Sequence, residues 1–294
     1  MKKQILILFY FLSISLLSFG QKIQELKLLD IKQMTQYDGR FDLSGISYQE
    51  DNIYVIADKK ENSHIYKLKW GKKNWTISPA VTFDLGVDID IEGVALYNED
   101  AYLINEANNE VYKVDLKNGN SSKLSIDWSK LKLPKKKWQK NAGFEGIAID
   151  EEKHILYLAK ERDPRFVIEI DLNNNTIIEE YDVKKTCSRD FADLYFYKGF
   201  IYGIERNALC IAKIDPVTHK VVQHLSYKNV ASRDGEKLYE PVKYGMAEAL
   251  MIKDGVIWLG WDNNGEEVSD FAKEKYNLTG NLPVIMLLEL PDAE

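Results

Sequence analysis

The sequence predicts an all-β fold, and specifically a five-bladed β-propeller. Five related segments recur along the 294-residue chain, with spacings of 48, 53, 48 and 55 residues between matching positions. Each segment has two runs of alternating apolar and polar residues around a polar turn, which is the pattern of a β-hairpin. Helix-period segments are nearly absent. Repeats of this length with three or four strands each are typical of propeller blades.

The chain begins with a candidate leader, "MKKQILILFYFLSISLLSFG". Two lysines precede an apolar run that ends in small residues, which predicts a signal peptide over residues 1–20 and an exported, periplasmic or secreted protein. A membrane anchor is the alternative, but the apolar run is short for a spanning helix, and no span is expected in the mature chain. Residues 21–294 have a suitable length for a single propeller domain.

The five hairpins are followed by a third alternating run, such as "IYKLKW" or "CIAKIDP", and in most units by a fourth, such as "WTISPAVTFDL". The last unit ends early. Because an open ring would leave two unpaired sheet edges, the N-terminal run "IQELKLLDIKQM" is expected to supply the outer strand of the last blade. Six blades remain the alternative, if that run and residues 263–281 build a further unit.

Polar residues occupy matching positions in all five hairpins. The first set opens the first strand of each hairpin and comprises Ser44, Glu92, Glu145, Asp193 and Glu248. The second set closes the second strand and comprises Asp58, Glu106, Glu161, Glu205 and Asp262. The separations within each hairpin are all even, so the two positions lie opposite each other at the same end of the blade. The first strand of a blade lines the central channel, so the first set should form a ring at one mouth.

Four carboxylates and a hydroxyl in one ring would repel each other unless a cation compensates. The ligands are all hard oxygens, which favours Ca²⁺ over zinc or copper, with Mg²⁺ disfavoured by the width of the ring. The alternative is that these acids cap strands or pair with nearby lysines and arginines.

The motifs "LSGI", "IEGV" and "FEGIA", with the hairpins that follow them, resemble the bacterial SdiA-regulated and phytase-like (esterase-like) propeller families. The ring also resembles the central calcium site of the calcium-activated apyrase nucleotidases. That resemblance implies calcium ligands at Ser44, Glu92, Glu145 and Glu248. Asp193 departs from the pattern, since the apyrases have a serine in that blade.

Cations accompany the second set, and these are Lys59, Lys60, Lys160, Arg162 and Arg206. Calcium flanked by carboxylates and by cations that bind an anion could hydrolyse a phosphoester or other anionic ester, with Glu106 or Glu161 as general base. Ordinary ion pairing is the alternative interpretation of these residues. A non-catalytic binding propeller tied together by calcium therefore remains open beside the hydrolase, and a glycosidase is a weaker third possibility.

The net charge of −7 argues against a nucleic-acid partner, so the expected partner is a small anionic substrate or a protein ligand. Cys187 and Cys210 could form a disulfide in an exported chain, although the sequence does not give the geometry. No histidine stands near them in the sequence, so no zinc site is expected, and all four histidines are predicted to be solvated. The basic loop 130–141 is expected near the acidic mouth, and Trp261 is a candidate ligand contact.

Overall fold

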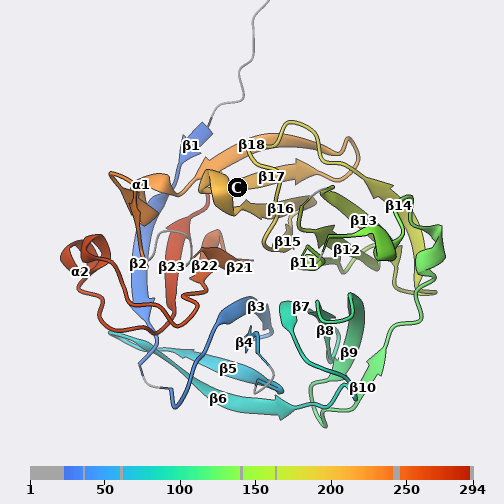
Figure 1. The fold of residues 1–294 in the computed structure, drawn as a ribbon, viewed down its shortest axis with the longest axis horizontal. Coiled ribbons are helices and arrows are strands. Elements are labelled where there is room, and N and C mark those ends of the chain that lie inside the picture. The colour runs from blue at the N-terminus through green and yellow to red at the C-terminus, as the bar shows by residue number, and fades with distance from the viewer. Residues whose placement is uncertain are drawn as a thin grey trace, which may run out of the picture.

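The computed structural model describes residues 23–35, 37–59, 62–139, 142–162, 164–240 and 246–291. Five sheets are arranged around a central axis (Figure 1), so the prediction of a five-bladed propeller is confirmed. The first strand of each sheet lies nearest the axis. The predicted leader, residues 1–20, lies outside the described residues.

Each blade is built on three or four antiparallel strands that follow one another outward in chain order, and the two N-terminal strands join the outer edges of blades 4 and 5. Blade 1 comprises β3 (Leu43–Gln49), β4 (Asn52–Ala57), β5 (His64–Trp70) and β6 (Trp75–Thr82). Blade 2 comprises β7 (Ile91–Tyr97), β8 (Asp100–Asn105), β9 (Glu110–Asp115) and β10 (Ser121–Lys123). Blade 3 comprises β11 (Phe144–Asp150), β12 (Ile155–Lys160), β13 (Phe166–Asp171) and β14 (Thr176–Tyr181). Blade 4 contains β15 (Leu194–Tyr197), β16 (Phe200–Glu205), β17 (Cys210–Asp215) and β18 (Lys220–Ser226). Blade 5 contains β21 (Ala247–Lys253), β22 (Val256–Trp261) and β23 (Val284–Glu289).

The turns between strands form at residues with positive φ or with side chains that accept backbone hydrogen bonds. The dipeptides Lys198-Gly199 and Asp254-Gly255 both have positive φ at each residue, as two-residue turns between twisted strands require. In blades 2, 3 and 4 an aspartate at the end of the third strand accepts a backbone N–H two residues later, which starts the turn into the outer strand.

The N-terminal segment closes the ring as expected, because β2 (Lys27–Gln33) pairs antiparallel with β23 and completes blade 5. A second contact was not predicted. β1 (Ile23–Glu25) pairs in parallel with β18, the outer strand of blade 4, and the two lie side by side in Figure 1. The first described residues thus join the edges of two neighbouring blades.

Residues 263–281 form no extra blade. They include helix α2 (Asp270–Tyr276), which starts where Ser269 Oγ accepts the Ala272 N–H at 3.1 Å and ends at Asn277, whose φ is 55°. The other short elements are α1 (Lys228–Ala231), β19 (Ser232–Arg233), β20 (Glu236–Lys237) and the 3₁₀ turns η1 (Trp128–Lys130), η2 (Lys135–Lys137) and η3 (Arg206–Ala208).

The basic loop folds back on the protein. Lys135 Nζ lies 3.7 Å from the centre of the Trp128 ring and 3.3 Å from Glu110 Oε1. Burial lowers the pKa of Lys135 to about 8. Lys135 therefore packs against Trp128 and Glu110 and does not extend towards a ligand.

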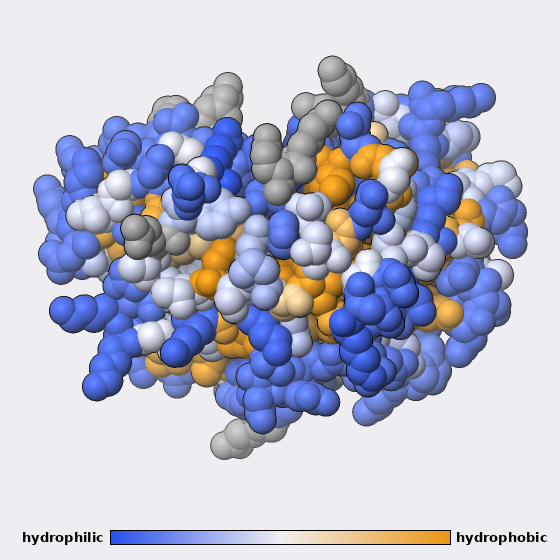
Figure 2. Space-filling view, turned by 90° about the horizontal axis from the view of Figure 1, so that it is seen from below, coloured by the Kyte–Doolittle hydropathy of each residue, from blue (hydrophilic) through white to orange (hydrophobic). Residues whose placement is uncertain are grey.

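Apolar side chains fill the spaces between blades, as in the cluster of blades 3 and 4 that contains Ala148, Tyr157, Leu194, Ile201 and Ala212. Seen from the side, hydrophilic residues cover most of the surface, and apolar residues show near the middle (Figure 2). Within the described part of the chain, no helix has the length and apolar character needed to cross a membrane.

Candidate functional site at the acidic mouth

A β-bulge marks the first-set position of blades 1, 2, 3 and 5. The pairing between the first and second strands skips Ser44, Glu92, Glu145 and Glu248, so each is the extra residue of its bulge. In blade 4, Asp193 lies one residue before β15, and its carbonyl oxygen and the Ala192 N–H both bond to Ile204. A bulge redirects a side chain and is frequent beside functional sites. The four bulges and the matching position of Asp193 therefore put the first set at the same end of every inner strand.

Two members of this first set bond to the backbone of a neighbouring blade. Ser44 Oγ donates to the Ile91 carbonyl oxygen of β7 at 2.7 Å. The Asp193 carboxylate accepts the N–H groups of Leu194, at 2.7 Å, and of Leu250 in β21, at 2.8 Å. Both residues therefore fasten one inner strand to the next.

Glu145 and Glu248 share a cation, which is Arg206. Its Nη1 lies 2.6 Å from Glu248 Oε1, and its Nη2 lies 3.1 Å from Glu145 Oε2. Nη2 also contacts Glu161, and Nε lies 3.1 Å from Asp190 Oδ2. The Arg206 side chain is only 13% exposed, so its positive charge compensates the carboxylates of Glu145 and Glu248 inside the protein.

The remaining first-set residue, Glu92, belongs to a separate cluster with Asp58 and Asp90. One carboxylate oxygen of each lies within 4.8 Å of the other two, and they come from blades 1 and 2. Burial raises the pKa of Asp58 to about 7, against the opposing effect of Lys59. Burial and the carboxylates of Asp58 and Glu145 raise the pKa of Glu92 well above its ordinary value. We refer to Asp58, Asp90 and Glu92 as the acidic triad.

The triad fits a hard divalent cation. Its donors are all carboxylates, and the buried Asp58 Oδ1 makes no hydrogen bond with any described residue. Lys59 contacts the other oxygen of Asp58, but its side chain is 35% exposed and can turn outward. Lys59 has φ of 85°, an uncommon conformation for a residue with a side chain and a frequent one at ligand sites.

The rest of the second set falls into different surroundings. Glu106 accepts the Gly143 N–H at 3.0 Å, and burial raises its pKa. Glu161 is fully buried and contacts the guanidinium groups of Arg162 and Arg206. Asp262 accepts the backbone and side-chain N–H groups of Asn264. Glu205 contacts His224 and Cys210 of the same blade and none of the other described second-set acids.

Of the cations that the sequence singled out, the four that the structure describes are each engaged by neighbouring protein groups. Lys59 pairs with Asp58 and Arg206 with the ring glutamates. Lys160 is fully buried, with its Nζ 5.4 Å from the centre of the Trp138 ring and bonded to the Arg162 carbonyl oxygen. Arg162 keeps 42% of its side chain exposed, while Lys60 lies outside the described residues.

Trp261 does not face a ligand. It is 2% exposed and packs edge-on against Tyr227 in the core, so the proposal of a ligand contact was wrong. The reason is that its alternation in β22 points it between blades 4 and 5.

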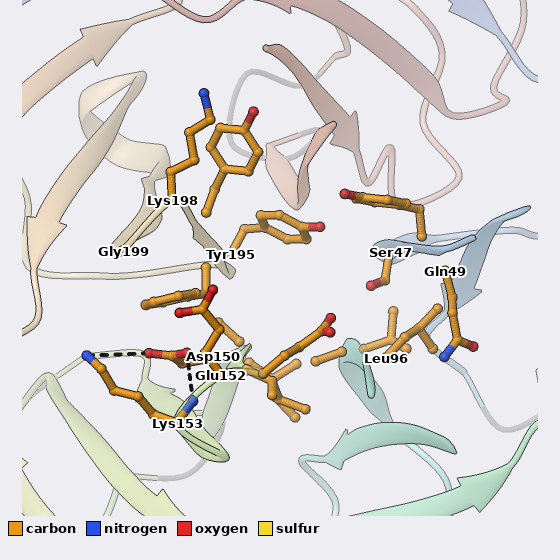
Figure 3. A pocket seen from close by; sticks show the side chains of 18 of the residues that line it. Ser47, Gln49, Leu96, Asp150, Glu152, Lys153, Tyr195, Lys198 and Gly199 are labelled. Carbon is orange, nitrogen blue, oxygen red and sulfur yellow. Dashed lines mark hydrogen bonds and ion pairs between the residues drawn. The ribbon is translucent and has the colours of Figure 1, made fainter. Parts of the chain in front are cut away.

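A cavity of about 630 Å³ lies at the opposite mouth, where the inner strands end. Tyr195 points into it from blade 4, and Ser47 and Glu152 line it from blades 1 and 3, while Asp150 pairs with Lys153 at its edge (Figure 3). The sequence did not predict this cavity. Its lining residues stand at the ends of the inner strands, and no residue type recurs there from blade to blade to mark the positions.

The sequence reasoning also missed Asp90, Asp42 and Asp190. Asp90 stands two residues before Glu92, so strand alternation already places both side chains on the same side. Asp42 stands at the same point before Ser44, is fully buried and lies 2.5 Å from Arg40 Nε. The shared spacing was the available signal for Asp42 and Asp90, whereas Asp190 stands three residues before Asp193 and does not share it.

Fold and site together define a five-bladed propeller with an acid-lined mouth. The family described as SdiA-regulated matches residues 21–198, more than half of the sequence, and the chain belongs to that family. No curated protein matches the sequence.

Solved structures with similar folds have little sequence in common with the chain. The crystal structure of glutaminyl cyclase from Myxococcus xanthus matches with a TM-score of 0.57 and 11% identity, over 92% of this chain and 100% of that one. The aldose sugar dehydrogenase from Streptomyces coelicolor, in its PQQ-bound form, has a TM-score of 0.49 and 9% identity, over 90% and 97%. A gluconolactonase from Xanthomonas campestris has a TM-score of 0.49 and 7% identity, over 85% and 72%. These likenesses concern the fold.

Proposed function

We propose that this protein is an exported, calcium-binding propeller, and that Asp58, Asp90 and Glu92 hold the ion at the acidic mouth. The observation that carries the proposal is the convergence of three carboxylates within 4.8 Å, one of which keeps a buried oxygen without a hydrogen-bond partner among the described residues. A divalent cation would favour the ionised carboxylates against the effect of burial.

Charge at this mouth also favours a cation. Carboxylates outnumber cationic groups among the described residues there. The carboxylates belong to Asp42, Asp58, Asp90, Glu92, Glu106, Glu145, Glu161, Asp190, Asp193, Glu248 and Asp262, and the cations to Arg40, Lys59, Arg162 and Arg206. The acid excess gives this mouth a negative potential, which attracts cations and opposes an anionic ligand until a metal ion is bound.

The ring expected from the sequence is a larger set of candidate calcium ligands. It comprises Ser44, Glu92, Glu145, Asp193 and Glu248. Ser44 and Asp193 bond to the backbone, and Arg206 neutralises Glu145 and Glu248. The acidic triad therefore offers the better donor set, and Glu92 belongs to both.

Calcium titration of the chelator-treated protein by calorimetry tests this function. Asp90→Asn and Glu92→Gln should each weaken binding at least tenfold, since each removes one charged ligand. Glu152→Gln, which removes an acid at the opposite mouth, is the matched control and should bind as the wild type does. Equal affinity in all four proteins would refute the triad as the site.

Hydrolysis of a phosphoester or other anionic ester is a second candidate, favoured by the position of Glu106. Its carboxylate has a pKa raised by burial, accepts the Gly143 N–H and is influenced by the guanidinium groups of Arg162 and Arg206. A raised pKa suits a general base, and the exposed Arg162 is the described cation best able to receive an anion. Bound calcium would supply a positive charge for the ester oxygen.

Phosphate release from a panel of nucleotides and phosphoesters, with calcium and with chelator, separates the two candidates. For a hydrolase, turnover should require calcium and fall at least 100-fold in Glu106→Gln. Glu161→Gln should lower stability instead, because Glu161 anchors two arginines. Calcium binding without turnover of any substrate would favour the non-catalytic propeller.

A further inference from the structure

A second group of side chains of metal-ligand type lies in blade 4 and shares no residue with the acidic triad. Cys187 precedes the inner strand, Glu205 ends β16, Cys210 begins β17 and His224 stands in β18. Ligand atoms of Cys187, Glu205 and His224 all lie within 4.8 Å of one another. The expectation that no histidine lies near the cysteines was therefore wrong, because antiparallel pairing of β16, β17 and β18 brings together residues distant in sequence.

His224 is the side chain that most needs a partner. It is 2% exposed, so the prediction of a solvated histidine is wrong for this residue. Neither Nδ1 nor Nε2 forms a hydrogen bond with any described residue. Nε2 lies 3.2 Å from Glu205 Oε2 but without the alignment of a hydrogen bond. A buried imidazole with two unsatisfied nitrogens is costly unless something binds it.

The spacing of the donor atoms suits a tetrahedral ion. Cys210 Sγ lies 3.5 Å from Glu205 Oε2, which is the same oxygen that approaches His224. In a tetrahedral zinc site, ligand atoms are roughly 3.3–3.8 Å apart, given bond lengths of about 2.0–2.3 Å. The two measured separations are close to that range. The other carboxylate oxygen, Oε1, accepts the Ser188 N–H at 2.9 Å, so Glu205 is held in place by the residue that follows Cys187.

We propose that Cys187, Glu205 and His224 bind a thiophilic divalent cation, Zn²⁺, and that Cys210, which lies beside Glu205 but outside this group of three, shifts towards the ion as the fourth ligand. Thiolate and imidazole donors favour zinc over calcium, so this site and the acidic triad select different metals. On binding, the thiol protons leave to solvent and the sulfur lone pairs bond to the metal. Cys187 is exposed, which gives the ion a route from solvent.

A disulfide between Cys187 and Cys210 is the competing use of the same thiols. Neither cysteine forms a disulfide in this structure. The bond would remove both sulfur ligands and leave His224 without its metal partner, so a thiol count on the exported protein is the first measurement. Two free thiols per chain are expected. A stoichiometric disulfide in the folded, exported protein would overturn the proposal.

The second measurement is zinc and cobalt binding to the reduced protein with Asp90→Asn in the background, so that the acidic triad does not contribute. One equivalent of Zn²⁺ should bind, and Co²⁺ should show thiolate charge-transfer and tetrahedral d–d absorption. Cys187→Ser and His224→Gln should each weaken zinc binding at least tenfold, and Cys187→Ser should reduce the charge-transfer band.

His219→Gln is the matched control, because His219 stacks on Tyr181 with ring centres 3.7 Å apart and is not part of the cluster. It should bind zinc as the parent does. The exposed Cys187→Ser keeps the test decisive if the buried His224 variant fails to fold. Zinc binding that is unchanged in Cys187→Ser, or absent from the reduced parent, would contradict the site.

Discussion

Arg206 contacts four carboxylates at the acidic mouth, namely those of Glu145, Glu161, Asp190 and Glu248. Arg206→Gln should lower the free energy of unfolding by about 3–5 kcal/mol in chelator, because it leaves buried carboxylates without their cation. Urea denaturation measures the change. Arg233→Gln, which breaks exposed ion pairs to Glu236 and Glu274, should cost under about 1 kcal/mol. Similar losses in both variants would contradict this role for Arg206.

Glu145 should make the calcium-free protein less stable as the pH rises. Burial, opposed by Arg206 and reinforced by Glu248, raises the pKa of Glu145 to about 8 from an ordinary value near 4.5. Between these values the folded protein binds more protons than the unfolded chain, so stability falls with rising pH. One pKa unit corresponds to about 1.4 kcal/mol. Denaturation from pH 5 to 8 in chelator should show the slope, and Glu145→Gln should reduce it. An equal slope in both proteins would assign the effect to other groups.

The positions of the acids could be predicted from the sequence, whereas their partners could not. Repeat spacing gave the matching positions of Glu92, Glu145 and Glu248, because register follows from strand alternation. The pairing of Glu145 and Glu248 with Arg206 depends on how η3, which begins at Arg206, directs that side chain, and the repeat carries no signal for it. The burial of His224 depended in the same way on the pairing of β17 and β18.

At the level of the strand, the glycines that follow the ring residues permit close packing of inner strands. A Cβ at Gly93 would lie 2.8 Å from the Glu145 carbonyl oxygen, and one at Gly146 would lie 2.9 Å from the Leu194 nitrogen. Blade 5 has Ala249 at the same position, where a methyl group is already accommodated. The "EG" motif thus reflects backbone contact between neighbouring blades.

Gly93→Ala should therefore destabilise the protein by about 1–3 kcal/mol, since the contact is with backbone that cannot move aside. Thermal unfolding measures the loss. The reverse change in blade 5, Ala249→Gly, should cost no more than about 1 kcal/mol. If Gly93→Ala unfolds like the wild type, the inner strands have more freedom than the structure shows.

The hairpins themselves were predictable, because alternation and turn residues are local signals. The bulges were not, since one extra residue leaves the sequence pattern almost unchanged. The parallel pairing of β1 with β18 was also missed, because three residues are too few to show a pattern.

At the level of the whole molecule, the closing strand is expected to govern cooperativity. A chain that starts at residue 34 lacks β1 and β2 and leaves β23 as an open edge. It should lose a single cooperative urea transition. The matched control starts at residue 26 and lacks only β1, and it should keep that transition with a modest loss of stability. Cooperative unfolding of the shorter chain would show that blade 5 does not need β2.

Ring closure could be predicted from the early end of the fifth unit, because a propeller with an open edge is unfavourable whatever its sequence. The number of blades followed from the same argument. Which acids at the mouth group together did not follow, because it depends on which carboxylates converge and which are paired with arginine.

The pairing of β2 with β23 also implies an order in which the blades form during synthesis. The two strands are separated by almost the whole described chain, so during synthesis β2 has no partner until β23 has left the ribosome. Contacts between such distant segments form slowly, because a long loop must close first. Blade 5 should therefore be the last to form, and a chain in transit would remain open at this seam until its final strand arrives.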